Sequence, residues 1–262
     1  MSLPRLRLER CTNLGEGLWR IDEEQSHHLV KVLRVLNGEE IEGLLSGERW
    51  RMRLELAGKA VVAREMLPLP GRGRLPRIVL LASLLKGGDF ELLLRGVTEA
   101  GVSKIVPIEA SRSVPRFTEE EVPRKLARWR KILEESTRQC GAAEIPQILP
   151  PVSLEKALEG ELPDLRIAGF LEEGTVPLGS IPPAAEVAVA IGPEGDWDER
   201  EKAMLRETGF CPVSLGPLVL KAFTASIVAC SYFVLAWEGR IHGKSCRDEI
   251  QDRSPGVQDK PV

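Results

Sequence analysis

From Arg77 onward the sequence alternates short apolar segments with longer amphipathic ones, and this alternation restricts the fold more than any other feature. Strands are predicted over five apolar segments, namely residues 77–84, 104–108, 165–171, 186–191 and 210–215. Helices are predicted over residues 89–100, 123–140, 198–209 and 220–238. Strands that alternate with helices along a chain pair in a mainly parallel sheet, with helices on both faces. The sequence therefore predicts an α/β fold for this part of the chain.

Residues 1–67 follow a different pattern, which is that of β-structure. Residues 50–56 alternate apolar and polar side chains strictly, as a strand with one buried face does. Residues 40–45 precede them across a Ser46-Gly47-Glu48 turn, so the two segments are expected to form a hairpin. The side chains expected to face the core are those of Trp50, Met52, Leu54 and Leu56. A small β-barrel or sandwich is predicted for this region.

A short helix is predicted over residues 27–36, which lie before this hairpin. Its expected apolar face consists of Leu29, Val32, Leu33 and Leu36. His27 and His28 at its start are interpreted as packing or capping residues rather than as a catalytic base.

Composition divides the chain into segments. Residues 68–76 contain three prolines and two glycines, which is typical of a linker. The predicted organisation is therefore an amino-terminal domain over 1–67, a linker over 68–76 and a second domain over 77–238. Residues 239–262 are polar and aperiodic, and a disordered tail is expected there.

The distribution of charge leaves two interpretations open. The net charge of the chain is -3, but residues 1–150 carry a net +4 and the remainder a net -7. A basic face in the first 150 residues could attract phosphate groups. Ordinary solvated surface charge explains the same counts equally well.

Cysteines and apolar runs exclude several classes of protein. The five cysteines form no CxxC pair and only three histidines are present, so no metal site is expected. The longest uncharged run, residues 222–237, spans 16 residues, which is short for a membrane helix and is expected to be a buried one. No signal peptide is recognisable, so the protein is expected to be cytoplasmic, without membrane attachment.

Three loops contain glycine directly after predicted strands, at residues 169–173, 191–196 and 214–220. In open α/β sheets, ligands bind where loops leave the carboxyl ends of strands. Glycine lets the main chain approach a ligand closely, although each glycine alone is also explained by a simple turn. The chain contains neither GxGxxG nor GxxxxGK[ST], which argues against a dinucleotide or P-loop site.

These loops belong to a series of short motifs that resembles a known family. The motifs are residues 28–34 (HLVKVLR), 85–87 (LKG), 98–102 (TEAGV), 139–141 (QCG), 191–195 (IGPEG) and 214–217 (SLGP). In this order and spacing they resemble the RsmE family of the SPOUT superfamily, which methylates N3 of a uridine in small-subunit ribosomal RNA. The resemblance extends over about residues 5–238.

The resemblance implies a SPOUT-type, trefoil-knotted domain with a mainly parallel sheet, preceded by an amino-terminal PUA-like β-barrel that helps to hold RNA. It also implies a homodimer, and as partner either small-subunit ribosomal RNA or the assembled subunit. The implied cofactor is S-adenosyl-L-methionine. The positions implied to bind it are Leu171, Gly192, Glu194, Gly195, Leu215, Gly216 and Leu220.

Departures from the family pattern concern the substrate pocket. The family reads GPEGG, LGxRxLRxETA and QxGR, where this chain has Asp196 for the last glycine and Ala142 for the arginine of QxGR. Leu218, Lys221 and Phe223 replace arginine, arginine and glutamate, whereas Thr224 still matches. Two alternatives therefore stay open. One is a methyltransferase with a different RNA target, and the other is a catalytically idle RNA-binding protein of ribosome assembly.

A chemical role follows for a few side chains. Uracil N3 must lose its proton to become a nucleophile, and a cation near O2 or O4 would stabilise the anion. Lys221 is the candidate for that cation and Thr224 a further catalytic candidate, although Lys221 could equally be an exposed surface lysine. Arg34 and Arg112 are candidate phosphate contacts or ordinary surface residues. The target base must be unpaired or flipped, because a duplex hides N3.

Overall fold

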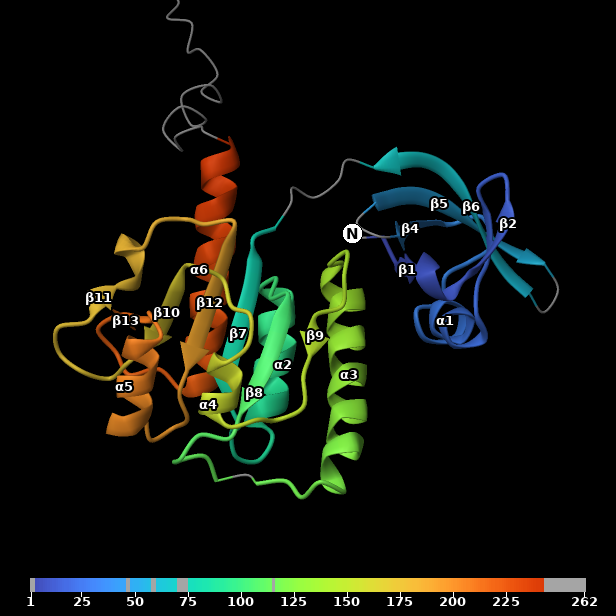
Figure 1. The fold of residues 1–262 in the computed structure, drawn as a ribbon. Coiled ribbons are helices and arrows are strands. Elements are labelled where there is room, and N and C mark those ends of the chain that lie inside the picture. Colours follow the sequence, from blue (N-terminus) through green and yellow to red (C-terminus); the bar gives the residue numbers. More distant parts are fainter. Residues whose placement is uncertain (1–2, 46–47, 58–59, 70–74, 115, 243–262) are drawn as a thin grey trace, which may run out of the picture.

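The computed structural model describes residues 3–45, 48–57, 60–69, 75–114 and 116–242. Two sheets are formed by successive parts of the chain, and Figure 1 shows them side by side, with a six-stranded sheet next to a larger α/β layer structure. The expectation of a disordered tail concerns residues 239–262, of which 243–262 lie outside the described residues.

The amino-terminal sheet is curled and mixed. Its order is β1-β4-β5-β6-β3-β2, and only the β1–β4 pair is parallel. Met52 and Leu54 are completely buried in its core as predicted, whereas Trp50 is half-buried and Leu56 is 40% exposed. The strands are β1 (Arg5–Arg7), β2 (Thr12–Gly15), β3 (Leu18–Arg20), β4 (Glu40–Leu45), β5 (Glu48–Ala57) and β6 (Ala60–Leu69), with a 3-10 turn η1 (Leu8–Arg10). The predicted hairpin of β4 and β5 is confirmed.

The prediction of a helix over residues 27–36 was wrong in its bounds and in its buried face. The helix α1 (Glu23–His27) begins after Asp22, whose carboxylate accepts a hydrogen bond from the Gln25 amide, and a π-helical turn η2 (His28–Val32) follows. The wider π turn changes the direction in which later side chains point. Leu29 is buried as expected, but Val32, Leu33 and Leu36 are 59%, 46% and 65% exposed.

The second sheet confirms the predicted parallel arrangement. Its order is β11-β13-β10-β12-β7-β8-β9, and the neighbouring strands are paired in parallel throughout its described residues. The strands are β7 (Arg77–Ser83), β8 (Lys104–Ile108), β9 (Gln147–Ile148), β10 (Arg166–Gly169), β11 (Val176–Pro177), β12 (Glu186–Ile191) and β13 (Cys211–Ser214). The helices are α2 (Asp89–Glu99), α3 (Glu121–Cys140), α4 (Leu154–Leu158), α5 (Glu199–Glu207) and α6 (Ala222–His242), with a 3-10 turn η3 (Leu178–Ser180).

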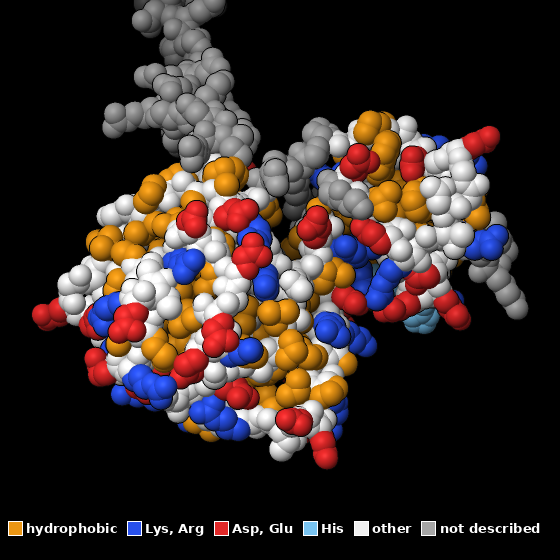
Figure 2. Space-filling model, in the orientation of Figure 1, with side chains coloured by type: hydrophobic (Ala, Val, Ile, Leu, Met, Phe, Trp, Pro, Cys, Tyr) orange, Lys and Arg blue, Asp and Glu red, His pale blue; other side chains and the backbone are white. Residues whose placement is uncertain are grey.

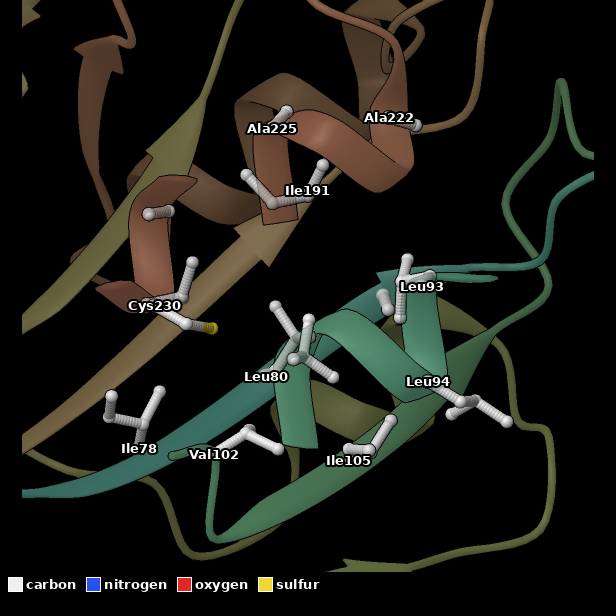
Figure 3. Packing of buried hydrophobic residues seen from close by; sticks show 14 of the residues in the cluster. Ile78, Leu80, Leu93, Leu94, Val102, Ile105, Ile191, Ala222, Ala225 and Cys230 are labelled. Atoms are coloured by element: carbon white, nitrogen blue, oxygen red, sulfur yellow. The ribbon is translucent and has the colours of Figure 1, made fainter. Parts of the chain in front are cut away.

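Both faces of this sheet are covered, because its strands are apolar on both sides. Ile78 and Leu80 of β7 point to one core, which they share with α2, α3 and α6. Figure 3 shows their neighbours Leu93 and Leu94 of α2 and Cys230 of α6. Val79 and Leu81 point to the opposite core, under α4 and α5. The sheet is thus held rigidly from both faces.

The amino-terminal sheet contacts the rest of the structure at the carboxyl end of α3, which lies next to this sheet in Figure 1. A guanidinium nitrogen of Arg10 lies 2.9 Å from the carboxylate of Glu134 on α3. Arg7 donates a hydrogen bond to the carbonyl of Ala143 at 3.3 Å, and Arg5 donates one to the carbonyl of Gln139. The helix ends at Gly141, in the left-handed conformation with φ 73°. Polar contacts therefore join the two parts.

Surface charge is mixed. Figure 2 shows acidic and basic side chains interspersed over both parts of the visible face, with no continuous basic area. Among the described residues, no helix has both the length and the hydrophobicity that a membrane span requires. The same residues contain no group of three or more His, Cys, Asp or Glu side chains that could hold a metal ion.

Candidate active site

A cleft lies where three neighbouring strands of the parallel sheet end. Gly169, the last residue of β10, is paired with Ile191 of β12 and with Val213 of β13. The loops after these strands therefore leave the same edge of the sheet, and they enclose a cleft of about 250 Å³. In Figure 1 the three strands lie beside α5. The predicted site residues that line the cleft are Leu171, Gly192, Glu194, Leu215, Gly216, Leu220 and Lys221.

Two glycines shape the main chain of this cleft. A Cβ atom at Gly192 would lie 3.2 Å from both the main-chain nitrogen and the indole ring of Trp197, which is completely buried. Gly216 has φ 130°, a conformation that side chains disfavour, and its amide donates to the Ser214 hydroxyl at 3.3 Å. Glycine is therefore required at both positions by close packing or by backbone conformation.

Glu194 connects the loop after β12 to the loop after β7. Its carboxylate accepts a hydrogen bond from the Lys86 amide at 3.3 Å. This contact brings the LKG motif of residues 85–87, noted in the sequence, to the border of the cleft. Glu194 thus has a structural contact beside its proposed one with a cofactor.

Gly195 and Arg112 contact each other rather than the interior of the cleft. The carbonyl of Gly195 accepts a hydrogen bond from Arg112 Nη1 at 2.6 Å, and Gly195 is not among the lining residues. A Cβ atom at Gly195 would meet Arg112 Cδ at an ordinary 3.4 Å. The structure therefore places Gly195 at the back of the loop and uses Arg112 to hold it. Arg34 lies apart from both, exposed on the turn after η2 with φ 57°.

The residues predicted to act on the substrate lie at the start of α6. Lys221 is exposed and lines the cleft, and its ammonium lies 5.8 Å from the centre of the Phe223 ring. Thr224 is half-buried and is not among the lining residues. Leu218, which replaces a family arginine, is 77% exposed at the mouth of the cleft. Of the two catalytic candidates, the structure thus brings only Lys221 to the cleft.

Sequence reasoning missed several residues of this region. Asp196 was noted only as a departure from a motif, but its side chain lines the cleft and lies 3.0 Å from Lys202 of α5. Trp197 supports Gly192 from below. The sequence did offer a signal for Trp197, since tryptophan is on average a largely buried residue, even between polar neighbours such as the two aspartates here.

Comparison with known families agrees with this geometry. A family model described as an RNA methyltransferase domain matches residues 73–234, the stretch that contains the parallel sheet and the cleft. Fold, cleft and family model together define the class as RNA methyltransferases.

Individual relatives narrow this class. A ribosomal RNA small subunit methyltransferase E from Synechocystis is 29% identical over 226 residues, which are 78% of this chain and 69% of that protein. The crystal structure of a ribosomal RNA small subunit methyltransferase E from Neisseria gonorrhoeae, bound to S-adenosyl methionine, superposes with a TM-score of 0.77 at 27% identity. A putative methyltransferase from Legionella pneumophila, in complex with the same cofactor, gives 0.78 at 26%. Each alignment to a structure covers 90% of this chain and 98% of the other.

The chain belongs to the RNA methyltransferase domain family, and it is similar over most of its length to proteins named ribosomal RNA small subunit methyltransferase E. The resemblance stated from the motifs is thereby confirmed.

Proposed function

We propose that this protein transfers a methyl group from S-adenosyl-L-methionine to N3 of a uridine in small-subunit ribosomal RNA. The observation that carries the proposal is the cleft at the ends of β10, β12 and β13, which lies in the stretch matched by the RNA methyltransferase model. Relatives that align over most of the chain carry the name of the small-subunit enzyme, and two similar structures hold the cofactor.

The cleft has the character that such a cofactor requires. Gly216 leaves open space where a side chain would stand, which suits a flat adenine ring, and the amides and carbonyls of these loops can bind its edge. Leu171, Leu215 and Leu220 supply apolar walls. S-adenosyl-L-methionine, when bound, supplies an electrophilic methyl group attached to a sulfonium. The residues of this chain position it and exclude water.

Lys221 is the group proposed to act on the base. It lies on the cleft, where its positive charge would stabilise the negative charge that develops on uracil when N3 loses its proton. An ammonium is a point charge without the planar fork of an arginine, so it can stabilise one oxygen but does not fix the ring in two places. Thr224 is proposed to orient the base from the adjacent part of α6. Because Thr224 is half-buried and does not line the cleft, this role requires α6 or the loop before it to shift when the substrate binds.

Contacts with RNA are proposed at both ends of the molecule. The end of η2 and the turn after it expose Lys31 and Arg34 together with Val32, Leu33 and Leu36, a mixture of cations and aliphatic side chains that suits unpaired nucleotides. We propose that residues 1–67 form a PUA-like barrel that presents this turn. Arg112 is proposed as a second phosphate contact, near the cleft, through the donors that its bond to Gly195 leaves available.

The finer features of the fold are also proposals. A trefoil knot is supported by the path of the chain, which leaves β12 for β13 and then returns through α6 to pack against β12 and β7.

A homodimer is supported by exposed apolar side chains near the cleft and on α6, namely Leu218, Val219 and Leu235 at 77%, 77% and 66% exposure. Light scattering should then give about twice the chain mass of 28.9 kDa. A cytoplasmic location fits an enzyme of ribosomal RNA.

A second candidate is a methyltransferase with a different RNA target. It is favoured by the surroundings of Lys221, whose near neighbour is the ring of Phe223 where the family has a carboxylate. A catalytically idle assembly protein is the extreme form of this alternative.

One labelling experiment separates these candidates. The purified protein is incubated with isolated small subunits, with free small-subunit RNA and with labelled S-adenosyl-L-methionine, and the modified base is identified by mass spectrometry. We expect 3-methyluridine at one position. Label in another base or position supports the second candidate, and cofactor binding without any incorporation supports the idle protein.

A further inference from the structure

Asp196 occupies an unusual position in the loop after β12. Its backbone is in the left-handed region, with φ 60°, where aspartate is tolerated better than most residues with a side chain. A glycine would adopt this conformation at no cost, so conformation alone does not explain an aspartate here. The side chain, which is 12% exposed, lines the cleft.

The carboxylate of Asp196 joins two of the three cleft loops. Its Oδ2 atom accepts a hydrogen bond from the main-chain amide of Leu171, the first residue after Phe170 in the loop that follows β10. The two atoms are 3.3 Å apart and the residues are 25 positions apart in the sequence. Leu171 is itself a wall of the cleft, so this bond fixes the position of one wall relative to the loop after β12.

Lys202 of α5 holds the carboxylate from behind. Its side chain is only 8% exposed, and its ammonium lies 3.0 Å from Asp196 Oδ2 and 3.7 Å from Glu172. Burial lowers the pKa of Lys202, but the hydrogen bond and charge of Asp196, with a contribution from Glu199, outweigh burial and raise it. Lys202 therefore keeps its charge at neutral pH, and this buried cation is compensated only while the carboxylates around it stay in place.

The same loop is held at a second point. Arg206, one turn further along α5, pairs with Glu172, and its guanidinium lies 5.0 Å from the centre of the Phe170 ring. Phe170 is buried and Lys202 lies 5.8 Å from its ring. Helix α5 thus presents two cations to the loop after β10, and Asp196 extends this contact to the loop after β12.

We propose that Asp196 is a positioning residue, which with Lys202 forms a latch that sets the shape of the cofactor cleft before the cofactor binds. This inference rests on the proposed function, because it assigns the latch to the cofactor of that same site. A preformed cleft loses less conformational entropy on binding than one whose loop must first be ordered, so the latch raises affinity without touching the ligand.

The test uses three variants and two measurements. Asp196→Gly keeps the left-handed backbone but removes the latch, whereas Asp196→Asn keeps an acceptor for the Leu171 amide. Glu199→Gln is the matched control, because Glu199 is also paired with Lys202 but is 85% exposed, and within the described part of the chain no hydrogen bond or ion pair joins it to the loop after β10. Hydrogen exchange of the Leu171 amide is measured by NMR in the cofactor-free protein, and affinity for S-adenosyl-L-methionine is measured by calorimetry.

For Asp196→Gly we expect about tenfold faster exchange at Leu171 and about tenfold weaker cofactor binding, a change of about 1.4 kcal/mol that is mainly entropic. Asp196→Asn, which keeps an acceptor for the Leu171 amide but loses the charge paired with Lys202, should lie between Asp196→Gly and the parent in both measurements, and Glu199→Gln should match the parent protein. Parent-like exchange and affinity in Asp196→Gly would refute the latch. Weaker binding with unchanged exchange at Leu171 would also overturn it, since Asp196 would then contact the cofactor directly. If the parent protein binds no cofactor, the proposed function fails, while the exchange rates still decide whether the latch exists.

Discussion

The cleft of the parallel sheet and the exposed turn after η2 both carry residues predicted for function, but they are built in different ways. The cleft consists of main chain and apolar side chains at the ends of strands that are covered on both faces. The turn presents charged and aliphatic side chains beside the smaller core of the amino-terminal sheet. A rigid, close-packed site responds sharply to one added atom, whereas an exposed charged surface responds in small, nearly additive steps.

The largest effect is expected at Lys221, the one cation that the sequence predicted on the cleft. Lys221→Ala should lower kcat about 100-fold or more, because a donor directed at a developing anion is lost, and should leave cofactor affinity nearly unchanged. The measurement is methyl transfer to isolated small subunits under saturating cofactor. Parent-like turnover would mean that Lys221 is an ordinary surface lysine.

A related pair of changes tests why this chain differs from its family. Lys221→Arg restores the guanidinium, and Phe223→Glu restores the carboxylate that could orient it, in place of the ring that now lies 5.8 Å from the ammonium. The double variant should have a higher rate of methyl transfer than the better single variant. A double-mutant cycle on that rate measures the coupling between residues 221 and 223. Strictly additive effects would show that residue 223 does not orient residue 221.

The next largest effect is expected from a side chain placed at Gly192, where the cleft loop packs closely against Trp197. Gly192→Val should weaken cofactor binding about 10- to 100-fold, because its side chain would be forced against Trp197, and such overpacking costs about 1–3 kcal/mol. Gly195→Val in the same loop is the matched control, since it would meet only the flexible Arg112 side chain. Calorimetric titration and a thermal unfolding curve are measured for both. Equal losses in the two variants would contradict the assignment of Gly192 to the inner face of the loop.

These two glycines show how far the sequence could predict the site. The IGPEG motif and its place after a strand were sufficient to locate the loop, since an apolar run such as residues 186–191 has clear ends. The motif could not tell which glycine lines the cleft. That depends on Trp197 turning back under Gly192 and on Arg112, 83 residues away from Gly195 in the sequence.

The fold shows the same division between local and distant information. Strands β7, β8 and β12 were predicted to within one residue, because periodicity and burial agree there. The π-helical turn η2 after α1 was not predicted. Its apolar residues could equally belong to an α-helix, but a π turn has a different period, so they point in other directions. The contact of Arg5 with Gln139 at the carboxyl end of α3 joins residues 134 positions apart, and no local pattern encodes it.

A smaller effect is expected on the exposed turn. Arg34→Gln should weaken binding of small-subunit RNA a few-fold. It should also make the negative slope of log affinity against log salt shallower by about 0.7, the value for one phosphate of a single strand. Arg64→Gln is the control, because Arg64 lies on β6 in the same amino-terminal part of the chain and is paired with Glu55. The measurement is a filter-binding titration at several salt concentrations. A slope equal to that of the parent would remove Arg34 from the RNA-binding surface, and cofactor affinity should stay the same in either variant.

The smallest effect is expected at the contact between the two regions of the fold, the amino-terminal sheet and the part that contains the parallel sheet. The strength of this contact determines whether the two regions unfold together. Arg10 and Glu134 are 2.9 Å apart, but their side chains are 39% and 30% exposed, and Arg10 also lies 3.3 Å from Glu24. A partly exposed pair of this kind contributes about 0.2–1 kcal/mol and is screened by salt. A double-mutant cycle with Arg10→Gln and Glu134→Gln, measured by urea unfolding, should give a coupling in that range that disappears at high salt. The pair Arg77–Glu186, within the parallel sheet and also at 2.9 Å, is a reference for an exposed pair that does not cross between the regions.

A coupling well above the reference, or one that salt does not reduce, would mean that the two regions are joined more tightly than these polar contacts imply. The exposed turn and the cleft would then be held at a fixed separation, and the RNA would have to fit that distance.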